Sequence, residues 1–366
     1  MTRRLRVLSV VGTRPNFMKV APVARQLAEH PELEHTLIHT GQHYDDAMSR
    51  VFFHELGLPE PDVYLGVGSG SHTAQTARVL AGLEPVLREH RPDVVLVPGD
   101  VNSTLAAALA AKQLGVAVGH IEAGLRSFDR TMPEELNRVL TDQISDLLFI
   151  HSPEARQHLL AERRPADAIH DVGNTMIDTL VALREAIAGR EVLTTLDLDP
   201  RRYILVTLHR PALVDGPLLA EAIEALCRLA DAFDIVFPMH PRTRARLQNS
   251  GSSRRLHPRL RLLDPLGYLD FLRLAESAAA VLTDSGGVQE ETTFLGVRCF
   301  TLRANTERPI TLELGTNTLL GLDPARIDEI PQLLSANGSG PARVPPGWDG
   351  QAARRIVAVL QSLPGA

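Results

Sequence analysis

Short apolar runs rich in β-branched residues alternate with amphipathic segments along the whole chain. This alternation is typical of a parallel β-sheet whose strands are joined by crossover helices. The rhythm is the same in both halves of the 366-residue chain, which is long enough for two domains of ordinary size. The sequence therefore predicts an α/β fold with two similar, doubly wound, Rossmann-like domains.

The apolar runs predict strands at Leu5–Val11, His35–Thr40, Asp93–Pro98, Ala117–Ile121, Asp146–His151 and Ile169–Gly173, and then at Tyr203–His209, Asp234–His240, Arg261–Asp264, Ala279–Asp284, Arg298–Arg303 and Thr318–Gly321. The polar, proline-containing stretch within residues 172–202 predicts a domain boundary. We therefore expect an N-terminal domain over residues 1–178 and a C-terminal domain over 179–351. The tail predicts a helix over residues 352–366, after a turn rich in Gly and Pro.

Composition excludes several classes of partner. The net charge of −6 provides no general attraction to nucleic acid or to an anionic membrane. Cys227 and Cys299 form no CxxC pair, which favours two reduced thiols in a cytoplasmic protein. No apolar run approaches the length of a membrane span. His35, His39 and His43 recur every four residues, but they lie in a predicted strand and loop, so we expect no metal site there.

Ionisable and polar residues cluster just beyond the carboxyl ends of the predicted strands. Open α/β sheets bind their ligands at this rim, and two domains that face each other rim to rim would surround one cleft. A general preference of polar residues for loops explains single cases better than the full set. The set comprises Arg14, Lys19, Gln42, His43, Asp100, Glu122, His209, His240, Ser285, Gly286 and Gly287.

The most specific motif is DSGGVQEETTFLG, at Asp284–Gly296. A strand ends, two glycines let the backbone approach a ligand, and a helix begins, so its free N–H groups predict a phosphate site. Glu290 or Glu291 could accept hydrogen bonds from a ribose. The motif is also compatible with a purely structural role, as a capped helix after a glycine turn. Neither a G-x-S-x-G nucleophile elbow nor a G-x-G-x-x-G dinucleotide motif is present.

Several charged residues allow two interpretations. Arg303 and Arg308 could bind a diphosphate or form a surface ion pair with Glu307 or Glu313. Asp100 and Glu122 could be catalytic, or they could be neutralised by neighbours such as Arg126 and Arg138. Glu134 and Arg138 have the spacing of an i,i+4 helix pair.

The GVGSG segment at Gly66–Gly70 is rich in glycine but follows no convincing strand. A phosphate-binding glycine loop is expected directly between a strand and a helix. The segment is therefore interpreted as a flexible loop.

Taken together, the motifs resemble the non-hydrolysing UDP-N-acetylglucosamine 2-epimerase family. The matching segments are GTRPNFMKVAP, TGQHYD, GDVNST, HIEAGLRSFDR, PEELNR, VGNTMIDTL, VTLHRP, FPMHP, LTDSGGVQEE and NTERP. The resemblance covers nearly the whole chain and implies a GT-B-like fold, with two Rossmann-like domains facing across a cleft. It also implies a C-terminal helix that returns to the first domain, a homodimer, and a cytoplasmic isomerase of nucleotide-sugar and polysaccharide biosynthesis.

The resemblance also implies roles for individual residues. Arg14 and the Ser285–Gly287 turn would hold the diphosphate, Glu291 the ribose, and Phe271 would pack near the uracil. The sugar and the leaving phosphate would be surrounded by Lys19, Asp100, Glu122, Glu134, Arg138, His209 and Arg308. His43 and His240 are further candidates for substrate binding. No metal and no cofactor are implied.

Two departures from the family pattern bear on the substrate. The chain has His209–Leu213 as HRPAL where the better-known branch has HRREN, and Leu266 replaces a polar residue. The arginines that serve an activating second UDP-sugar in that branch are missing from Gly41–Tyr44 and Gly68–His72. This leaves open a modified substrate, such as a UDP-2,3-diacetamido-uronic acid. The motifs also leave open a hydrolysing epimerase, a GT-B glycosyltransferase and a non-catalytic UDP-sugar sensor.

The implied reaction can proceed without a redox cofactor. A C2 proton with no neighbouring carbonyl is weakly acidic, so its removal is easier if UDP leaves at the same time to give a 2-acetamidoglucal. UDP then adds back at C1 while the opposite face of C2 takes up a proton. This requires cations on the diphosphate, a base on one face and an acid on the other. Asp100, Glu122 and Glu134 are the candidates for acid and base, and His209 could protonate or bind the bridging oxygen.

Overall fold

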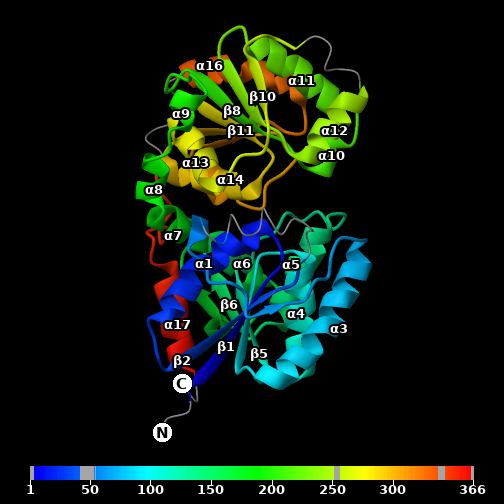
Figure 1. Ribbon diagram of the computed structural model, residues 1–366, viewed down its shortest axis with the longest axis vertical. Helices are drawn as coiled ribbons and strands as arrows, with labels where there is room; N and C mark the ends of the chain where they lie inside the picture. The colour runs from blue at the N-terminus through cyan, green and yellow to red at the C-terminus, as the bar shows by residue number, and fades with distance from the viewer. Residues whose placement is uncertain (1–3, 42–52, 54, 251–255, 337–342, 364–366) are drawn as a thin grey trace. The chain divides into compact units, whose positions relative to one another are not determined.

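The computed structural model describes residues 4–41, 53, 55–250, 256–336 and 343–363. It divides into two compact units. The N-terminal unit comprises residues 1–182 and 346–366, and the C-terminal unit comprises residues 183–345. Each unit is built on its own parallel sheet (Figure 1).

The sheet of the N-terminal unit has the strand order β3-β2-β1-β4-β5-β6-β7. All neighbouring strands are parallel, and both faces are covered, which is why their sequences are nearly continuous apolar runs. The strands are β1 (Leu5–Val11), β2 (Leu33–His39), β3 (Val63–Tyr64), β4 (Val94–Pro98), β5 (Ala117–Ile121), β6 (Leu147–Ile150) and β7 (Ile169–Asp171).

Two separate apolar cores lie on the two faces of this sheet. One contains side chains of α1 and α17 and the other contains side chains of α3 and α4. The helices are α1 (Arg14–Ala28), α3 (His72–His90), α4 (Asn102–Gln113), α5 (Pro133–Ile144), α6 (Pro153–Ala161), α7 (Thr175–Ala182) and α17 (Ala352–Gln361), with a short 3-10 turn η1 (Ala166–Ala168).

Helix α17, near the end of the chain, packs in the N-terminal unit beside α1 (Figure 1). The Asp178 carboxylate of α7 accepts hydrogen bonds from the backbone N–H groups of Ala352 and Ala353, at 3.1 and 2.7 Å, and so caps the first turn of α17. The Trp348 indole, which is 2% exposed, donates to the carbonyl of His151 at 2.9 Å. These polar contacts fix where the returning segment enters the core.

The C-terminal unit repeats the same winding, with the strand order β10-β9-β8-β11-β12-β13. Its strands are β8 (Tyr203–Thr207), β9 (Asp234–Pro238), β10 (Leu260–Leu263), β11 (Ala280–Thr283), β12 (Arg298–Thr301) and β13 (Asn317–Leu319). Its helices are α8 (Arg184–Ala188), α9 (Val192–Thr195), α10 (Pro211–Val214), α11 (Leu218–Leu229), α12 (Pro241–Ser250), α13 (Tyr268–Ser277), α14 (Gly286–Leu295), α15 (Ile310–Glu313), η3 (Pro324–Glu329) and α16 (Ile330–Ser335). In the part of the chain that the structure describes, no helix is both long and apolar enough to span a membrane.

The predicted strands are all present, with ends that differ by at most two residues, so the predicted α/β class is confirmed. One strand was missed. Two-residue β3 precedes the GVGSG segment, whose Val67 and Gly68 N–H groups donate to the carbonyls of Thr40 and Gly41 at 2.9 and 2.8 Å. The segment itself forms no helix or strand, as interpreted, but a strand does precede it and its first residues are hydrogen-bonded to the residues after β2. A two-residue edge strand is too short to produce a periodic signal.

The His35–His39 spacing falls on strand β2, as expected. Burial lowers the pKa of His35 to about 4, and its ring nitrogen Nε2 lies 2.9 Å from the Ser9 hydroxyl. The folded chain therefore holds this ring neutral at a pH where the unfolded chain, with a pKa near 6.5, already binds a proton.

We expect the folded state to lose stability as the pH falls from 6.5 to 4. Protons then bind the unfolded chain preferentially. The free energy of unfolding falls by at most about 3 kcal/mol, because the His35 side chain is only part-buried. The His35→Gln variant should lack this part of the pH dependence, whereas His90→Gln, on α3, should keep it. Urea unfolding at pH 7.0 and 4.5 measures the difference. Identical pH slopes for wild type and His35→Gln would contradict the assignment.

Candidate functional site

Both sheets have the strand order of a Rossmann fold, in which connections run in opposite directions from the two central strands. Ligands bind such sheets beyond the carboxyl ends of those strands. In the N-terminal unit the central strands β1 and β4 are followed by Arg14 and Asp100. In the C-terminal unit β8 and β11 are followed by His209 and Ser285. The structure thus places the sequence-predicted residues at the expected edge of each sheet.

The turn after β1 is held by one asparagine. The Asn16 side-chain oxygen accepts hydrogen bonds from the N–H groups of Gly12 and Thr13, at 3.1 and 3.2 Å, and its amide donates to the Pro98 carbonyl at 3.0 Å. A Cβ atom at Gly12 would collide with the side chain of Ser103, so only glycine fits. Arg14, half-buried at the start of α1, is positioned by this turn.

Lys19 and Glu122 form an ion pair within the N-terminal unit. Each side chain is 6% exposed, and the Lys19 ammonium contacts Glu122 Oε2. The ammonium also lies over the turn after β4, 2.8 Å from where a Cβ atom of Gly99 would be. Glu122 has a φ of 72°, a left-handed conformation that is uncommon for a residue with a side chain. The backbone therefore holds this carboxylate in an unusual orientation beside a buried cation.

Asp100 pairs with Arg138, whose side chain is 2% exposed. The other guanidinium nitrogen of Arg138 donates to Glu135 at 2.7 Å, three residues earlier on α5. Arg138 therefore pairs with Glu135 and not with Glu134, because Glu135 lies on the inward face of α5. Glu134 is half-buried. Glu135 also accepts the N–H groups of Ser127 and Phe128, both at 2.9 Å, so it shapes the loop after Glu122.

A second buried network links the turns that carry Asp100 and Glu122. The two ring nitrogens of His120 contact Asp142 at 2.6 Å and the Gly99 carbonyl at 2.7 Å. Asp142 also accepts the Gly124 N–H at 3.0 Å and pairs with Arg126 at 2.7 Å. Arg126 is thus a partner of Asp142, and of Glu162, and not of the two candidate catalytic carboxylates.

Helix α5 is polar on its inward side, which the sequence analysis missed. Its buried residues include Glu135, Arg138 and Asp142, whereas Leu136 and Leu140 are 46% and 49% exposed. The spacing i, i+3, i+7 of the three charged residues was the available signal, because it places them on one helix face.

In the C-terminal unit, helix α14 begins at Gly286, directly after Ser285. A Cβ atom at Gly286 would collide with the Arg308 guanidinium, since it would lie 2.8 Å from its central carbon. Arg308 therefore lies against the first turn of α14. The free N–H groups of that turn and the guanidinium together make a site suited to a phosphate or diphosphate.

Arg308 belongs to a buried cluster of charges. Its guanidinium contacts Glu307 at 2.6 Å and Glu290 at 2.9 Å, and Arg303 contacts Glu307 at 2.7 Å. All four side chains are 6% exposed or less, so the surface ion pair considered from the sequence is wrong. The Glu307 partner was correctly named. Gln289 stabilises the same loop, because its side-chain oxygen accepts the Thr306 hydroxyl at 2.6 Å.

His209 lies beside a fully buried carboxylate. Asp284 Oδ2 accepts the backbone N–H groups of His209 and Arg210, both at 2.8 Å, and Oδ1 lies 3.1 Å from His209 Nδ1. The imidazole itself is 43% exposed. Asp284 thus orients the loop after β8. Because Asp284 directly precedes the Ser285–Gly287 turn, it also links this loop to that turn.

The remaining candidates have different surroundings. Glu291, 3% exposed, accepts the Tyr268 hydroxyl at 2.8 Å. Phe271 packs half-buried against a core cluster of the C-terminal unit. His240 is exposed and its Nδ1 accepts the Arg242 N–H at 3.2 Å. His43 lies outside the residues that the structure describes.

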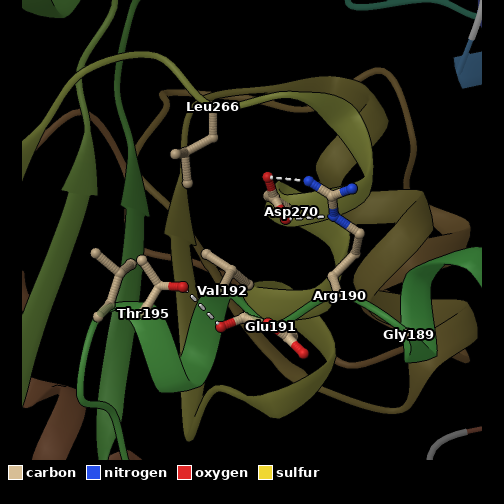
Figure 2. A pocket seen from close by; sticks show the side chains of 8 residues that line it. Gly189, Arg190, Glu191, Val192, Thr195, Leu266 and Asp270 are labelled. Carbon is tan, nitrogen blue, oxygen red and sulfur yellow. Dashed lines mark hydrogen bonds and ion pairs between the residues drawn. The ribbon is translucent and has the colours of Figure 1, made fainter.

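A cavity of about 470 Å³ lies elsewhere on the C-terminal unit, between α9 and the start of α13 (Figure 2). Arg190 and Asp270 meet at its wall with two contacts of 2.7 and 2.8 Å, and the Thr195 hydroxyl donates to the Glu191 carbonyl at 3.1 Å. Leu266, in the loop after β10, also lines this cavity. None of the candidate catalytic or binding residues lines it.

Comparison with known proteins agrees with this geometry. A family model described as UDP-N-acetylglucosamine 2-epimerase matches residues 25–361. A UDP-N-acetylglucosamine 2-epimerase of Methanococcus maripaludis is 44% identical, over 90% of this chain and 91% of the relative. A UDP-2,3-diacetamido-2,3-dideoxy-D-glucuronate 2-epimerase of Pseudomonas aeruginosa is 41% identical, over 87% and 88%.

The crystal structure of the Methanocaldococcus jannaschii UDP-GlcNAc 2-epimerase, in complex with UDP-GlcNAc and UDP, is also similar. It superimposes with a TM-score of 0.89 at 39% identity, over 98% of this chain and 99% of that one. The fold and the polar strand ends thus define a protein of two Rossmann-like units built like the nucleotide-sugar epimerases. The chain belongs to the UDP-N-acetylglucosamine 2-epimerase family.

Proposed function

We propose that the chain epimerises a UDP-N-acetylhexosamine at C2, interconverting UDP-GlcNAc and UDP-ManNAc by elimination and re-addition of UDP. The observation that carries the proposal is the pair of carboxylates after neighbouring strands β4 and β5. Asp100 and Glu122 each contact a buried cation, Arg138 and Lys19 respectively. A proton transfer on each face of one carbon requires two such oriented groups, one ionised to take the proton and one protonated to return it.

The first half of the reaction removes a proton and UDP together. A carboxylate takes the C2 proton, the C2–H electron pair forms the C1=C2 double bond, and the C1–O bond breaks with its electrons going to UDP. In the second half, a UDP oxygen attacks C1 and the opposite face of C2 takes a proton from an acid. Asp100, Glu122 and Glu134 are the candidates for these two roles, and His209 for binding or protonating the bridging oxygen.

We assign UDP binding to the C-terminal unit and the chemistry on the sugar to the N-terminal unit. Arg308 and the first turn of α14 supply the donors for the diphosphate, with Ser285, Gly286 and Gly287. Glu291 would hold the ribose and Phe271 would pack near the uracil. Arg14, Lys19 and Arg138 would add cations around the sugar and the leaving phosphate, and His43 and His240 are further candidates for substrate contacts.

NMR of UDP-GlcNAc incubated with the protein in D₂O tests the proposal. We expect UDP-ManNAc to form and deuterium to appear at C2 of the product, because the re-adding proton comes from a group in exchange with solvent. Product that keeps full protium at C2 would rule out this mechanism. Release of free N-acetylmannosamine with UDP would identify a hydrolysing enzyme instead, and turnover only with an added acceptor would identify a glycosyltransferase.

A second candidate substrate has a specific observation in its favour. The Pseudomonas aeruginosa relative, named for a UDP-2,3-diacetamido-2,3-dideoxy-D-glucuronate, is nearly as similar to this chain as the relative named for UDP-GlcNAc. The same D₂O experiment with both UDP-sugars compares them directly. A kcat/KM at least tenfold higher with the diacetamido-uronate would replace UDP-GlcNAc as the proposed substrate.

We also propose a homodimer that uses the outward face of α5. Leu136 and Leu140 are exposed four residues apart, and Phe128 and Leu160 are 74% and 45% exposed. Phe128, in the loop before α5, contacts His158 of α6 with 5.2 Å between the ring centroids, so this loop lies next to α6. Large apolar side chains that stay exposed on one region are typical of an interface.

A double substitution tests the dimer. Leu136→Glu with Leu140→Glu should shift the protein from dimer to monomer in analytical ultracentrifugation, because charged side chains are costly to bury in an apolar contact. Val344→Glu, at a residue of the C-terminal unit that is 46% exposed, is the control and should leave the mass unchanged. A dimer that survives the double substitution would place the interface elsewhere.

We propose the cytoplasm as the compartment. Neither Cys227 nor Cys299 forms a disulfide, and Cys299 is buried. Burial raises the pKa of the Cys299 thiol to about 11, which keeps it protonated and unreactive. Cysteines that form no disulfide are typical of reducing compartments. Fractionation of the producing cells is the test, and a membrane-associated or secreted protein would contradict the assignment.

A further inference from the structure

Both ring nitrogens of His120 face hydrogen-bond acceptors. The side chain lies on β5 and is fully buried. Its Nε2 is 2.7 Å from the carbonyl oxygen of Gly99, which can only accept, so Nε2 carries a hydrogen. Its Nδ1 is 2.6 Å from Oδ1 of Asp142. The charge state of His120 therefore depends on which of the two, Nδ1 or Asp142, holds the remaining proton.

The surroundings of Asp142 favour its ionised form. Its second oxygen accepts the Gly124 N–H at 3.0 Å and contacts the Arg126 guanidinium at 2.7 Å. The Gly124 N–H can only donate and the guanidinium is a permanent cation, so both contacts favour a carboxylate over a carboxylic acid. An ionised Asp142 leaves the proton on Nδ1. His120 then has a hydrogen on both nitrogens and a positive charge.

The resulting charges alternate in sign along one chain, which runs from the part-exposed Glu162 to the fully buried His120. The order is Glu162, Arg126, Asp142 and then His120. Each buried charge is thus compensated by its neighbours, which is the condition under which buried ions are tolerated. Since Arg126 is bound by both oxygens of Glu162, at 2.7 and 2.6 Å, the chain has a fixed geometry.

The chain of charges ends on the two turns that carry the candidate acid and base. His120 holds the carbonyl of Gly99, the residue before Asp100, and Gly99 has a φ of 64°. Asp142 holds the N–H of Gly124, two residues after Glu122, and Gly124 has a φ of 80°. Other backbone hydrogen bonds also hold these turns, from the Gly99 N–H to the Ile121 carbonyl at 2.9 Å and from the Glu122 N–H to the Phe149 carbonyl at 3.1 Å. The bonds of His120 and Asp142 add a direct link between the two turns.

We propose that His120 is a buried imidazolium that positions Asp100 and Glu122 relative to each other, as a positioning residue that does not touch the substrate. The proposal deepens the proposed epimerase function and rests on it. One cation, locked between Asp142 and Gly99, ties the β4–α4 turn to the turn after β5. Errors of about 1 Å in such groups cost roughly 100-fold in rate, so the tie has a measurable effect.

Two substitutions separate the two hydrogen bonds of His120. In His120→Gln the amide reaches the position of Nε2 and keeps the bond to Gly99. In His120→Asn the amide reaches only the position of Nδ1 and keeps the bond to Asp142. Both remove the charge, so both should lower the melting temperature by similar amounts. We expect kcat to fall about 100-fold in His120→Asn with KM within threefold, and His120→Gln to be at least tenfold more active.

Neutron diffraction from a deuterated crystal of the wild-type protein tests the charge without relying on activity or on a variant. Deuterium on both ring nitrogens of His120 is the expected result, and a bare nitrogen overturns the proposal. Wild-type kcat in both His120 variants, measured at a temperature at which they are folded, would also overturn the proposal. A doubly deuterated His120 in a protein that epimerises no UDP-sugar would refute the proposed function and leave the assignment of charge intact.

Discussion

Replacement of Glu122 by glutamine should lower kcat for epimerisation by about 10²- to 10⁴-fold, the range for loss of a general acid or base. The glutamine retains the shape and can still accept a hydrogen bond from Lys19, which contacts Glu122 in the wild type. It can neither take nor return a proton at C2. UDP affinity should stay within threefold of wild type, because the proposed diphosphate site is built from Arg308 and α14.

The measurement is the rate of deuterium incorporation at C2 in D₂O, followed by NMR, with UDP affinity from calorimetry. Glu89→Gln, at an exposed residue of α3, is the matched control and should be fully active. Asp100→Asn completes the comparison: a variant that lacks the acid still eliminates, and accumulates UDP and 2-acetamidoglucal, whereas one that lacks the base does neither. More than a third of wild-type kcat in Glu122→Gln would remove Glu122 from the mechanism.

The sequence predicted the two sheets well because their strands are buried on both faces. Continuous apolar runs such as Val94–Pro98 and Leu147–Ile150 are compatible with few other structures, and both strands occur with ends close to those expected. Edge strand β3 was missed because two residues give no periodicity. The polar strand ends were also predictable, since the edge at which ligands bind follows from the parallel topology itself.

The partners within the site were harder to predict. The sequence shows that Arg138 follows Glu134 by four residues, but the orientation of α5 decides that Glu135 is its partner. The same orientation buries Asp142 and exposes Leu136. Helix orientation depends on what the neighbouring strands present, and β5 presents His120, a polar residue in the middle of an apolar run. Buried partner groups can stabilise a charged helix face, and composition alone does not distinguish such a face from one that is exposed to solvent.

Replacement of Gly286 by alanine should weaken UDP binding by about 100-fold, or roughly 2.7 kcal/mol. The added Cβ atom would collide with the Arg308 guanidinium and lie 2.9 Å from Glu307 Oε1. Arg308 cannot simply rotate away, because its contacts with Glu307 at 2.6 Å and Glu290 at 2.9 Å are buried. Alanine favours a helix over glycine by about 1 kcal/mol, but the steric displacement of a buried ion pair is the larger effect.

Calorimetry with UDP and with uridine separates a local effect from general damage. Uridine lacks the diphosphate, so its affinity for Gly286→Ala should match wild type while that of UDP falls. Gly216→Ala is the control, since a Cβ atom there would meet no atom within 4 Å and the residue is exposed. Equal losses for uridine and UDP would indicate a disrupted C-terminal unit. Unchanged UDP affinity would mean that the diphosphate does not bind at the start of α14, and the assignment of Arg308 would fall with it.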